Sequence, residues 1–296
     1  MGESLRQRID LLLRTQNDDG GWGYFPGKRS WLEPTAYAML ALDKHADAAV
    51  LDRAWHLVES WQLADGSWRP GADVAGPGTW VTALGVHLCC ARGCFDESFT
   101  RGVAWLMGTQ GRECNWLARF IGLLQGMSKP GGPDNDVSHR GWPWLRGTTS
   151  WVEPTAQAIM ALKMAAPHYP GVADRVADAE EHLLSRRCRD GGWNYGSRRA
   201  LGIDLPSYPE TTALALLGLQ GRSDAVREEI AHARKLFAGT HSRLARAWLA
   251  VALQAHGEQP PAPEDEPNGD ILLAALEAIA HPDGNRSAFR VAGGRA

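Results

Sequence analysis

The sequence predicts an all-α protein in which one layer of helices surrounds another. Three observations indicate this fold: a long passage is repeated, helical periodicity runs along most of the chain, and no run of alternating strands is recognisable. Helices with one polar face alternate with helices rich in Ala and Leu, which are expected to be covered on most sides. We therefore expect an inner ring of helices wrapped by an outer one.

The repeated passage is the strongest of these observations. Residues 21–42 read GWGYFPGKRSWLEPTAYAMLAL and residues 141–162 read GWPWLRGTTSWVEPTAQAIMAL, identical at 12 of 22 positions without a gap. A looser third copy spans residues 192–219, with a longer loop before its Pro-Glu-Thr-Thr-Ala. A passage used more than once indicates a supersecondary unit that stacks on copies of itself.

The two classes of helix follow each other along the chain with one exception. Between inner-type residues 116–127 and 155–165, a Gly- and Pro-rich loop takes the place of an outer helix, and a loop of that length is usually functional. The outer-type segments are residues 5–15, 50–61, 99–107, 172–186 and 224–238, and the inner-type segments are residues 35–42, 79–91, 116–127, 155–165, 211–219 and 244–255.

The chain divides into three parts by composition. Residues 1–256 are expected to form one repeat domain, residues 257–270 an acidic Pro-rich linker, and residues 271–296 a C-terminal helix with a flexible tail. A single helical repeat domain can absorb a chain of 296 residues. Whether the last helix closes the ring or docks elsewhere is left open.

Charge and composition exclude several classes of partner. A net charge of −3 and a pI near 6.4 argue against nucleic acid or an anionic membrane as partner. Neither a secretion signal nor an apolar run long enough to span a membrane is recognisable. Five cysteines, an odd number, suit a reducing compartment, so a cytoplasmic protein is expected.

A cluster of His87, Cys89, Cys90 and Cys94 suggests a metal site at first sight. These residues fall on an apolar helical stretch, where neighbouring cysteines point in different directions and pack as small apolar side chains. Buried cysteines are therefore favoured over metal ligands, and no metal is expected.

Three loops share a pattern that predicts a structural staple. Residues 16–22 (QNDDGGW), 62–68 (QLADGSW) and 187–193 (RCRDGGW) each follow an outer-type segment. Asp-Gly favours a tight turn, because glycine adopts positive φ without strain. A Gln amide can cap its own helix and reach the next turn, while the Trp covers the junction. We expect these loops to join adjacent repeats.

Gln-x₃-Gly-x-Trp followed by Thr-Ala-x-Ala-x₂-Ala-Leu resembles the repeats of the squalene-hopene and oxidosqualene cyclases. Looser forms occur in the β subunits of protein prenyltransferases. The resemblance covers roughly residues 5–255. It implies an (α/α) toroid of about five or six helical hairpins, with a central cavity in which isoprenoids bind.

The same resemblance implies where an acid would lie. Squalene-type cyclases carry Asp-x-Asp-Asp-Thr-Ala, whose middle Asp protonates the alkene. That motif is absent here, and matching Thr-Ala to Thr-Ala places Glu153 at the middle Asp, with Glu33 and Glu210 in the other copies. The prenyltransferase zinc site needs Asp-x-Cys, which this chain lacks, so a zinc-dependent prenyltransferase is not expected.

The glutamates have a structural and a functional interpretation. Proline favours the first helical turn and a carboxylate there complements the helix dipole, so all three could serve only as caps, as three equivalent copies suggest. Alternatively, the inner helices open on one end of the cavity, where Glu33, Glu153 and Glu210 would meet. A carboxyl in an apolar pocket has a raised pKa and can act as a general acid.

Aromatic residues flank the same helix starts. The faces of Trp31, Trp80, Trp151 and Tyr208 could stabilise a carbocation, or the tryptophans could instead plug the barrel and leave no cavity.

The long loop that breaks the alternation adds further candidates. Asp134 and Asp136 could bind a divalent metal, but a turn is favoured there. His139 precedes the repeated Gly-Trp by two residues and could bond Asp136 or a cavity glutamate, and Trp144 follows.

We therefore predict a terpenoid-cyclase-like protein that binds an isoprenoid or other apolar molecule in the toroid, with a cavity glutamate starting cyclisation and no cofactor. The alternatives are a non-catalytic toroid that binds a lipid or partner peptide and, less favoured, a carbohydrate-active enzyme. The candidate acids are Glu153, Glu210 and Glu33, and the candidate substrate-binding residues are Trp31, Trp80, Trp144, Trp151, Tyr208 and His139.

Overall fold

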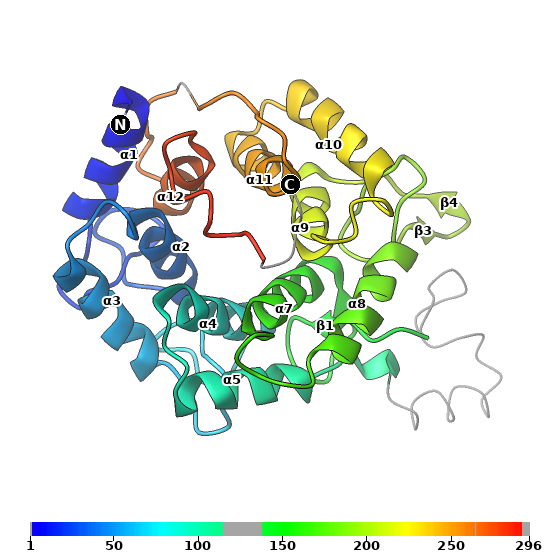
Figure 1. The fold of residues 1–296 in the computed structure, drawn as a ribbon, viewed down its shortest axis with the longest axis horizontal. Helices are drawn as coiled ribbons and strands as arrows, with labels where there is room; N and C mark the ends of the chain where they lie inside the picture. Colours follow the sequence, from blue (N-terminus) through cyan, green and yellow to red (C-terminus); the bar gives the residue numbers. More distant parts are fainter. Residues whose placement is uncertain (1, 115–137, 264, 292–296) are drawn as a thin grey trace.

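A computed structural model describes residues 2–114, 138–263 and 265–291, in which eleven α-helices form two concentric rings (Figure 1). This confirms the predicted (α/α) toroid. Neighbouring inner helices contact one another all the way round, from α2 through α12 and back to α2. The inner ring contains α2 (Leu32–Leu42), α4 (Thr79–Arg92), α7 (Val152–Ala165), α9 (Pro209–Gly218), α11 (Arg243–Ala255) and α12 (Ile271–Ala280). The outer ring contains α1 (Glu3–Arg14), α3 (Ala48–Ser60), α5 (Glu97–Met107), α8 (Ala173–Ser185) and α10 (Arg227–Gly239).

Sequence pattern explains which ring each helix joins. In α1, buried Leu5, Ile9 and Leu12 recur at helical spacing and the opposite face is polar, as an outer helix requires. In α2 every residue but Glu33 is buried, because neighbouring helices cover it on most sides. The helix expected at residues 116–127 lies outside the described residues.

Short hairpins and a 3₁₀ turn occupy the loops between helices. Strands β1 (Trp142–Pro143) and β2 (Ser150–Trp151) pair antiparallel, and so do β3 (Arg199–Ala200) and β4 (Ile203–Asp204). The 3₁₀ helix η1 (Arg112–Cys114) follows α5. These elements bracket the loops that lead into α7 and α9.

One tryptophan per repeat fastens an outer helix to an inner one. The backbone N–H of Trp22 donates to the Thr35 hydroxyl of α2 at 2.9 Å, and its indole N–H donates to the Leu12 carbonyl of α1 at 2.7 Å. The tryptophan rings are fully buried. The same pair of bonds recurs for Trp68 with Thr82 and Val58, Trp142 with Thr155 and Leu106, and Trp193 with Thr212 and Leu183.

The Gln staples lie where the sequence predicts them. The Gln16 amide donates to the Gly20 carbonyl of its own loop and to the Val50 carbonyl of α3. The Gln62 amide likewise donates to the Gly66 carbonyl of its own loop and to the Ser98 carbonyl of α5. Each loop glycine has a positive φ, +93° at Gly20 and +89° at Gly66, which a residue with a side chain rarely adopts.

Helix α12 completes the inner ring between α11 and α2. The buried Glu277 carboxylate accepts from Arg8 of α1 and from Arg243 of α11, both at 2.9 Å. Arg8 also donates to the Asp265 carbonyl in the Pro-rich linker. The ring therefore extends past residue 256, the boundary expected for the repeat domain.

The segment after α12 differs from the flexible tail that the sequence suggests. Residues 282–291 turn back toward the middle of the rings (Figure 1). Ala288, Phe289 and Val291 are buried there. The physical reason is that these apolar side chains find cover only inside the ring, which local sequence cannot reveal. Residues 292–296 lie outside the described residues.

None of the helices in the described ranges is long and apolar enough to cross a bilayer.

Candidate functional site

The candidate acids occupy equivalent positions at the amino-terminal ends of three inner helices. Glu33, Glu153 and Glu210 are the second residues of α2, α7 and α9. In the described part of the chain, no helix N–H donates to any of these carboxylates. Their interaction with the helix ends is therefore through the dipole alone.

The three carboxylates lie within electrostatic reach of one another. Burial, and after it the negative charges of Glu33 and Glu210, raise the pKa of Glu153 to about 7. Burial also raises the pKa of Glu33, although the Tyr24 hydroxyl, which donates to its Oε2 at 2.6 Å, opposes that shift. At neutral pH the site therefore holds a carboxyl that is partly protonated beside two others.

Two buried polar side chains lie one helical turn deeper. Tyr37 follows Glu33 by four residues on α2, and Gln157 follows Glu153 by four on α7, so each pair shares a helix face. Tyr37 is 0% and Gln157 3% exposed, yet among the described residues the Tyr37 hydroxyl and both polar atoms of the Gln157 amide have no hydrogen-bond partner. An unpaired buried polar group costs about 1–3 kcal/mol, so such groups mark a place where a ligand or water belongs.

Sequence reasoning missed Tyr37 and Gln157, although a signal was present. Tyr37 and Gln157 occupy the same position in the two best-matched repeat copies. The residues on either side of that position are identical in the two copies, so the difference between tyrosine and glutamine stands out.

Three of the candidate tryptophans lie at the starts of the inner helices α2 and α4. Trp31 lies 6.4 Å from Tyr24 between ring centroids, and the Arg29 guanidinium lies 4.5 Å above its ring. Trp80 contacts Trp144 edge to face at 5.3 Å. These three tryptophans of the candidate set are only partly buried, so they form a rim.

Trp80 holds a different place from the one expected. It lies inside α4 rather than before it, as the second residue of that helix. It thus takes the position that glutamate has in α2, α7 and α9. The start of α4 therefore contributes an aromatic ring to the rim instead of a carboxylate.

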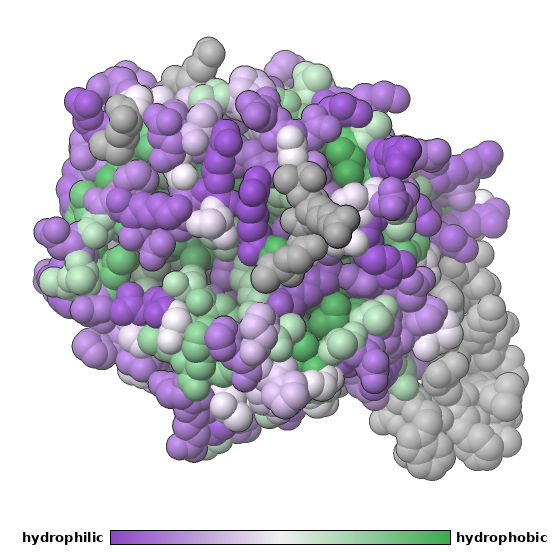
Figure 2. All heavy atoms as spheres, in the orientation of Figure 1, coloured by the Kyte–Doolittle hydropathy of each residue, from purple (hydrophilic) through white to green (hydrophobic). Residues whose placement is uncertain are grey.

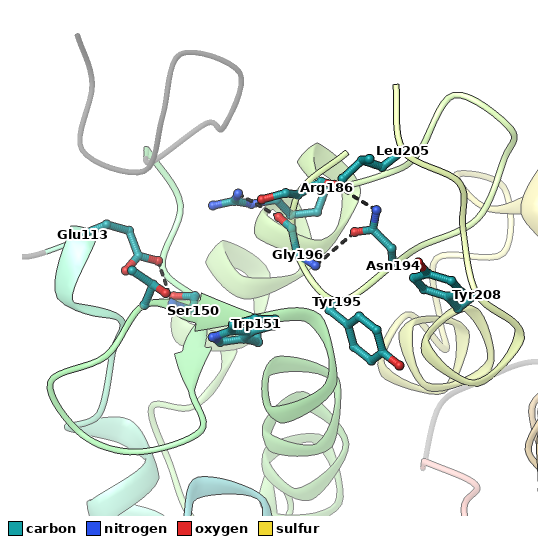
Figure 3. A pocket seen from close by; sticks show the side chains of 11 residues that line it. Glu113, Ser150, Trp151, Arg186, Asn194, Tyr195, Gly196, Leu205 and Tyr208 are labelled. Atoms are coloured by element: carbon teal, nitrogen blue, oxygen red, sulfur yellow. Dashed lines mark hydrogen bonds between the residues drawn. The ribbon is translucent and has the colours of Figure 1, made fainter. Parts of the chain in front are cut away.

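A pocket of about 300 Å³ opens beside the starts of α7 and α9 (Figure 3). Trp151 and Tyr208, 39% and 41% exposed, line it together with Tyr195, whose ring centroid is 5.2 Å from that of Tyr208. The Tyr195 carbonyl accepts from the Val152 N–H at 3.0 Å, which joins the two loops. The pocket walls are thus aromatic next to two of the candidate acids.

The opposite side of this pocket is polar. Glu113 accepts from the Ser150 N–H at 2.9 Å through one carboxylate oxygen, while its other oxygen is buried and has no hydrogen-bond partner in the part of the chain that the structure describes. The Arg186 guanidinium donates to the Gly196 carbonyl. The Asn194 side chain accepts from the Gly196 N–H and donates to the Ser197 carbonyl. None of these polar residues was predicted from the sequence.

His139 does not join the glutamates. Its Nδ1 lies 3.2 Å from Asp178 of the outer helix α8, and the same carboxylate binds Arg140 at 2.6 Å. Asp136, the other partner expected for His139, lies outside the described residues, as does Asp134.

The cysteine cluster is packed rather than ionised. Burial raises the pKa of Cys90 to about 12 and that of Cys89 still higher, so both thiols stay protonated. Burial lowers the pKa of His87 to about 4, so the ring is neutral, and its Nε2 lies 2.6 Å from the Ala288 carbonyl. Over the described ranges, His, Cys, Asp and Glu form no group of three suited to a metal ion.

Two curated relatives match a limited part of the sequence. A drimenyl diphosphate synthase from Streptantibioticus cattleyicolor is 43% identical over 81 residues, which is 26% of this chain and 14% of the relative. A second one, from Streptomyces showdoensis, is 42% identical over 69 residues, or 22% of this chain and 13% of the relative. The chain thus covers about one seventh of the length of these relatives. No protein-family profile matches it.

Solved structures share the fold over almost the whole chain. The type II terpene cyclase MstE from Scytonema matches 93% of this chain and 77% of its own, with a TM-score of 0.57 and 18% identity. The endoglucanase Cel10 from Klebsiella pneumoniae, a family 8 glycosyl hydrolase, matches 93% and 97%, with a TM-score of 0.61 and 15% identity. At these identities the likeness establishes the toroid, which enzymes of different chemistry share.

Proposed function

We propose that this protein binds an isoprenoid chain at the mouth of the toroid and that Glu153 protonates an alkene of that chain to start a cyclisation. The observation that carries the proposal is the environment of Glu153, whose pKa is raised to about 7 by burial and by the charges of Glu33 and Glu210. A general acid works best when its pKa lies near the working pH. A carboxyl that is still partly protonated at neutral pH meets that condition.

The proposed reaction is an isomerisation that needs no cofactor. The Glu153 proton forms a C–H bond with one alkene carbon, and the resulting carbocation is attacked by a second alkene, which closes a ring. The final cation then loses a proton to water, and Glu153 is protonated again from the solvent before the next turnover. The aromatic faces of Trp151 and Tyr208 would stabilise the positive charge between these steps.

The known proteins support the class of substrate. The curated relatives are drimenyl diphosphate synthases. MstE, which shares the fold, has been solved in complex with the substrate geranylgeranyl dihydroxybenzoate. Both point to prenyl chains, and the partly buried aromatic rim of this protein suits such an apolar molecule.

The alternative is a toroid that holds a lipid without converting it. One observation favours it: the chain's own C-terminal segment occupies part of the ring interior, where Phe289 is 1% exposed. The experiment that separates the two functions measures conversion and binding in the same samples.

Purified protein would be incubated with farnesyl and geranylgeranyl diphosphates, and cyclic isomers would be sought by mass spectrometry. Glu153→Gln should lower turnover about 100-fold or more, the usual loss when a general acid is removed. Glu33→Gln and Glu210→Gln are matched controls at equivalent repeat positions. They should retain most activity at low pH and shift its pH dependence downward, because a charge that raises the pKa of Glu153 is gone.

Equal and modest losses at all three positions would contradict the assignment of Glu153 as the acid. A wild-type protein that binds both prenyl diphosphates yet forms no isomer would establish the non-catalytic alternative.

A further inference from the structure

The C-terminal segment, residues 282–291, enters the ring from the end opposite the glutamates. Asn285 donates to the carbonyl of Leu40, near the carboxyl-terminal end of α2, at 2.9 Å. Lys44, just beyond that helix, donates to the Ser287 hydroxyl at 3.3 Å. Glu33 lies at the other end of the same helix, so the segment and the candidate acids approach the interior from opposite sides.

Buried side chains hold the backbone of this segment. The Gln220 amide, 4% exposed, donates to the Phe289 carbonyl at 2.7 Å and accepts from the Val291 N–H at 3.3 Å. His87, 3% exposed, bonds the Ala288 carbonyl. Since these contacts involve only backbone atoms of the segment, they hold it in place whatever side chain residue 289 carries.

The Phe289 ring itself meets three inner helices. It stacks on Tyr37 of α2 at 6.1 Å between centroids and packs edge to face against Trp248 of α11 at 5.9 Å and His87 of α4 at 5.3 Å. Helices α4 and α11 are not neighbours in the inner ring. A side chain that touches both therefore lies in the middle of the ring and not between two adjacent helices.

Helix geometry places this ring close below the acids. The inner helices contain 10 to 14 residues, which is about 15 to 21 Å of helix. Tyr37, on which Phe289 stacks, lies four residues from Glu33, or about 6 Å along the helix axis. The C-terminal segment thus occupies the deeper part of the interior, with Phe289 at the level of Tyr37 and about one helical turn below Glu33.

The face of the molecule in Figure 2 is mostly hydrophilic, with apolar side chains visible between the polar ones. Within the described C-terminal segment, Ala288, Phe289 and Val291 are buried. Three buried side chains and these five hydrogen bonds to the rest of the chain indicate that this segment is a built part of the ring interior.

We infer that Phe289 is the floor of the cavity that receives the isoprenoid chain, and that it sets the longest chain that fits above it. This inference rests on the proposed function for the nature of the ligand. The aromatic ring presents an apolar surface that suits a hydrocarbon end, while Tyr37 and Gln157 lie one helical turn from Glu33 and Glu153 on the surrounding helices. Phe289 is thus a specificity-determining residue contributed by the end of the chain.

The test measures chain-length preference in binding, which does not require turnover. Affinities of the full-length protein for geraniol, farnesol and geranylgeraniol would be measured for wild type, Phe289→Ala and Phe289→Leu. Phe289→Ala should raise the affinity for geranylgeraniol relative to farnesol about tenfold or more, since one methylene in an apolar pocket is worth about tenfold or more. Phe289→Leu, which keeps an apolar contact and the backbone bonds, should give a smaller shift in the same direction.

Phe95→Ala is the matched control, because Phe95 is 39% exposed and stacks on His168 at the outside of the molecule. It should leave the preference unchanged. Thermal unfolding of each variant would verify that the binding measurements are made on folded protein, and Phe289→Leu serves as the test if Phe289→Ala does not fold.

The outcomes separate the two proposals. If both Phe289 variants still bind prenyl alcohols with an unchanged chain-length preference, Phe289 does not limit the chain length. The proposed function would not be affected by that result. If the chain-length preference shifts but no prenyl diphosphate is converted, the result supports the assignment of Phe289. It contradicts only the catalytic part of the proposed function. Failure of every protein, wild type included, to bind a prenyl alcohol overturns both.

Discussion

Glu153 illustrates how the environment of one residue changes its chemistry. Its side chain is held by a helix start that any Glu-Pro-Thr-Ala sequence could form, yet burial and two like charges raise its pKa from 4.5 to about 7. Since the folded pKa exceeds the unfolded one, the folded state favours the protonated form. The stability that this provides is fully present below about pH 4.5 and is lost as the pH rises through about 7.

We predict that wild-type protein is about 3 kcal/mol less stable at pH 8 than at pH 4.5 through this group, at 1.36 kcal/mol per unit of pKa. Glu153→Gln cannot ionise and should remove most of that difference. Urea unfolding at the two pH values measures it. The control is Glu97→Gln, an exposed first-turn glutamate of α5, which should keep the wild-type pH dependence. The assignment is wrong if the two variants behave alike.

The helix pair is the unit that the repeated passage encodes. In each copy a buried tryptophan bonds an inner-helix threonine through its backbone and an outer-helix carbonyl through its indole. The two partners of each bond either lie close together in the sequence or recur in every repeat. The sequence alone therefore indicates that the outer and inner helices of a pair are joined. The Gln staples then set the next outer helix against it.

Thr155→Val tests this joint at nearly constant volume. It removes the hydroxyl that accepts from the Trp142 N–H at 2.8 Å and leaves that buried donor unpaired. We expect a loss of about 1–3 kcal/mol in the free energy of unfolding, measured by urea denaturation. Thr100→Val on the exposed side of α5 is the matched control and should change stability by less than about 0.5 kcal/mol. Equal effects would mean that the hydroxyl is not a structural acceptor.

At the scale of the whole molecule, the ring is closed by a buried group of ions. Glu277 of α12 lies between Arg8 of α1 and Arg243 of α11, which joins the first helix to the last two. The Arg8 side chain is 0% exposed and that of Glu277 is 5% exposed. Removing one member of such a group leaves the other charge buried, which is far more costly than losing an exposed pair.

Arg8→Met should therefore lower the free energy of unfolding by about 3 kcal/mol, near the lower end of the usual range because Arg243 still contacts Glu277. Arg6→Met lies on the same helix, and its pair with Glu3 is exposed, with 55% and 70% of the side chains accessible. That control should cost less than about 1 kcal/mol. Adding Glu277→Leu to Arg8→Met should recover part of the loss. Chemical denaturation of the four proteins provides the comparison.

The sequence by itself determined the two rings, the tryptophan and glutamine joints, and the equivalent positions of Glu33, Glu153 and Glu210. All of these depend on residues close together in the chain and on periodicity, which local sequence records. Capping and catalysis could not be distinguished in this way, because both place glutamate in the first turn. The difference lies in the surrounding charges and burial.

Only the tertiary structure decided what fills the ring. The closing position of α12, the place of Phe289 against Tyr37 and Trp248, and the unpaired amide of Gln157 arise from contacts between residues far apart in sequence. The pairing of His139 with Asp178 could not be predicted for the same reason. No local sequence pattern indicates which outer helix lies beside the loop that contains His139. An apolar tail has no preferred location until a complementary interior exists, and that interior forms only when all six inner helices of the described ring have assembled.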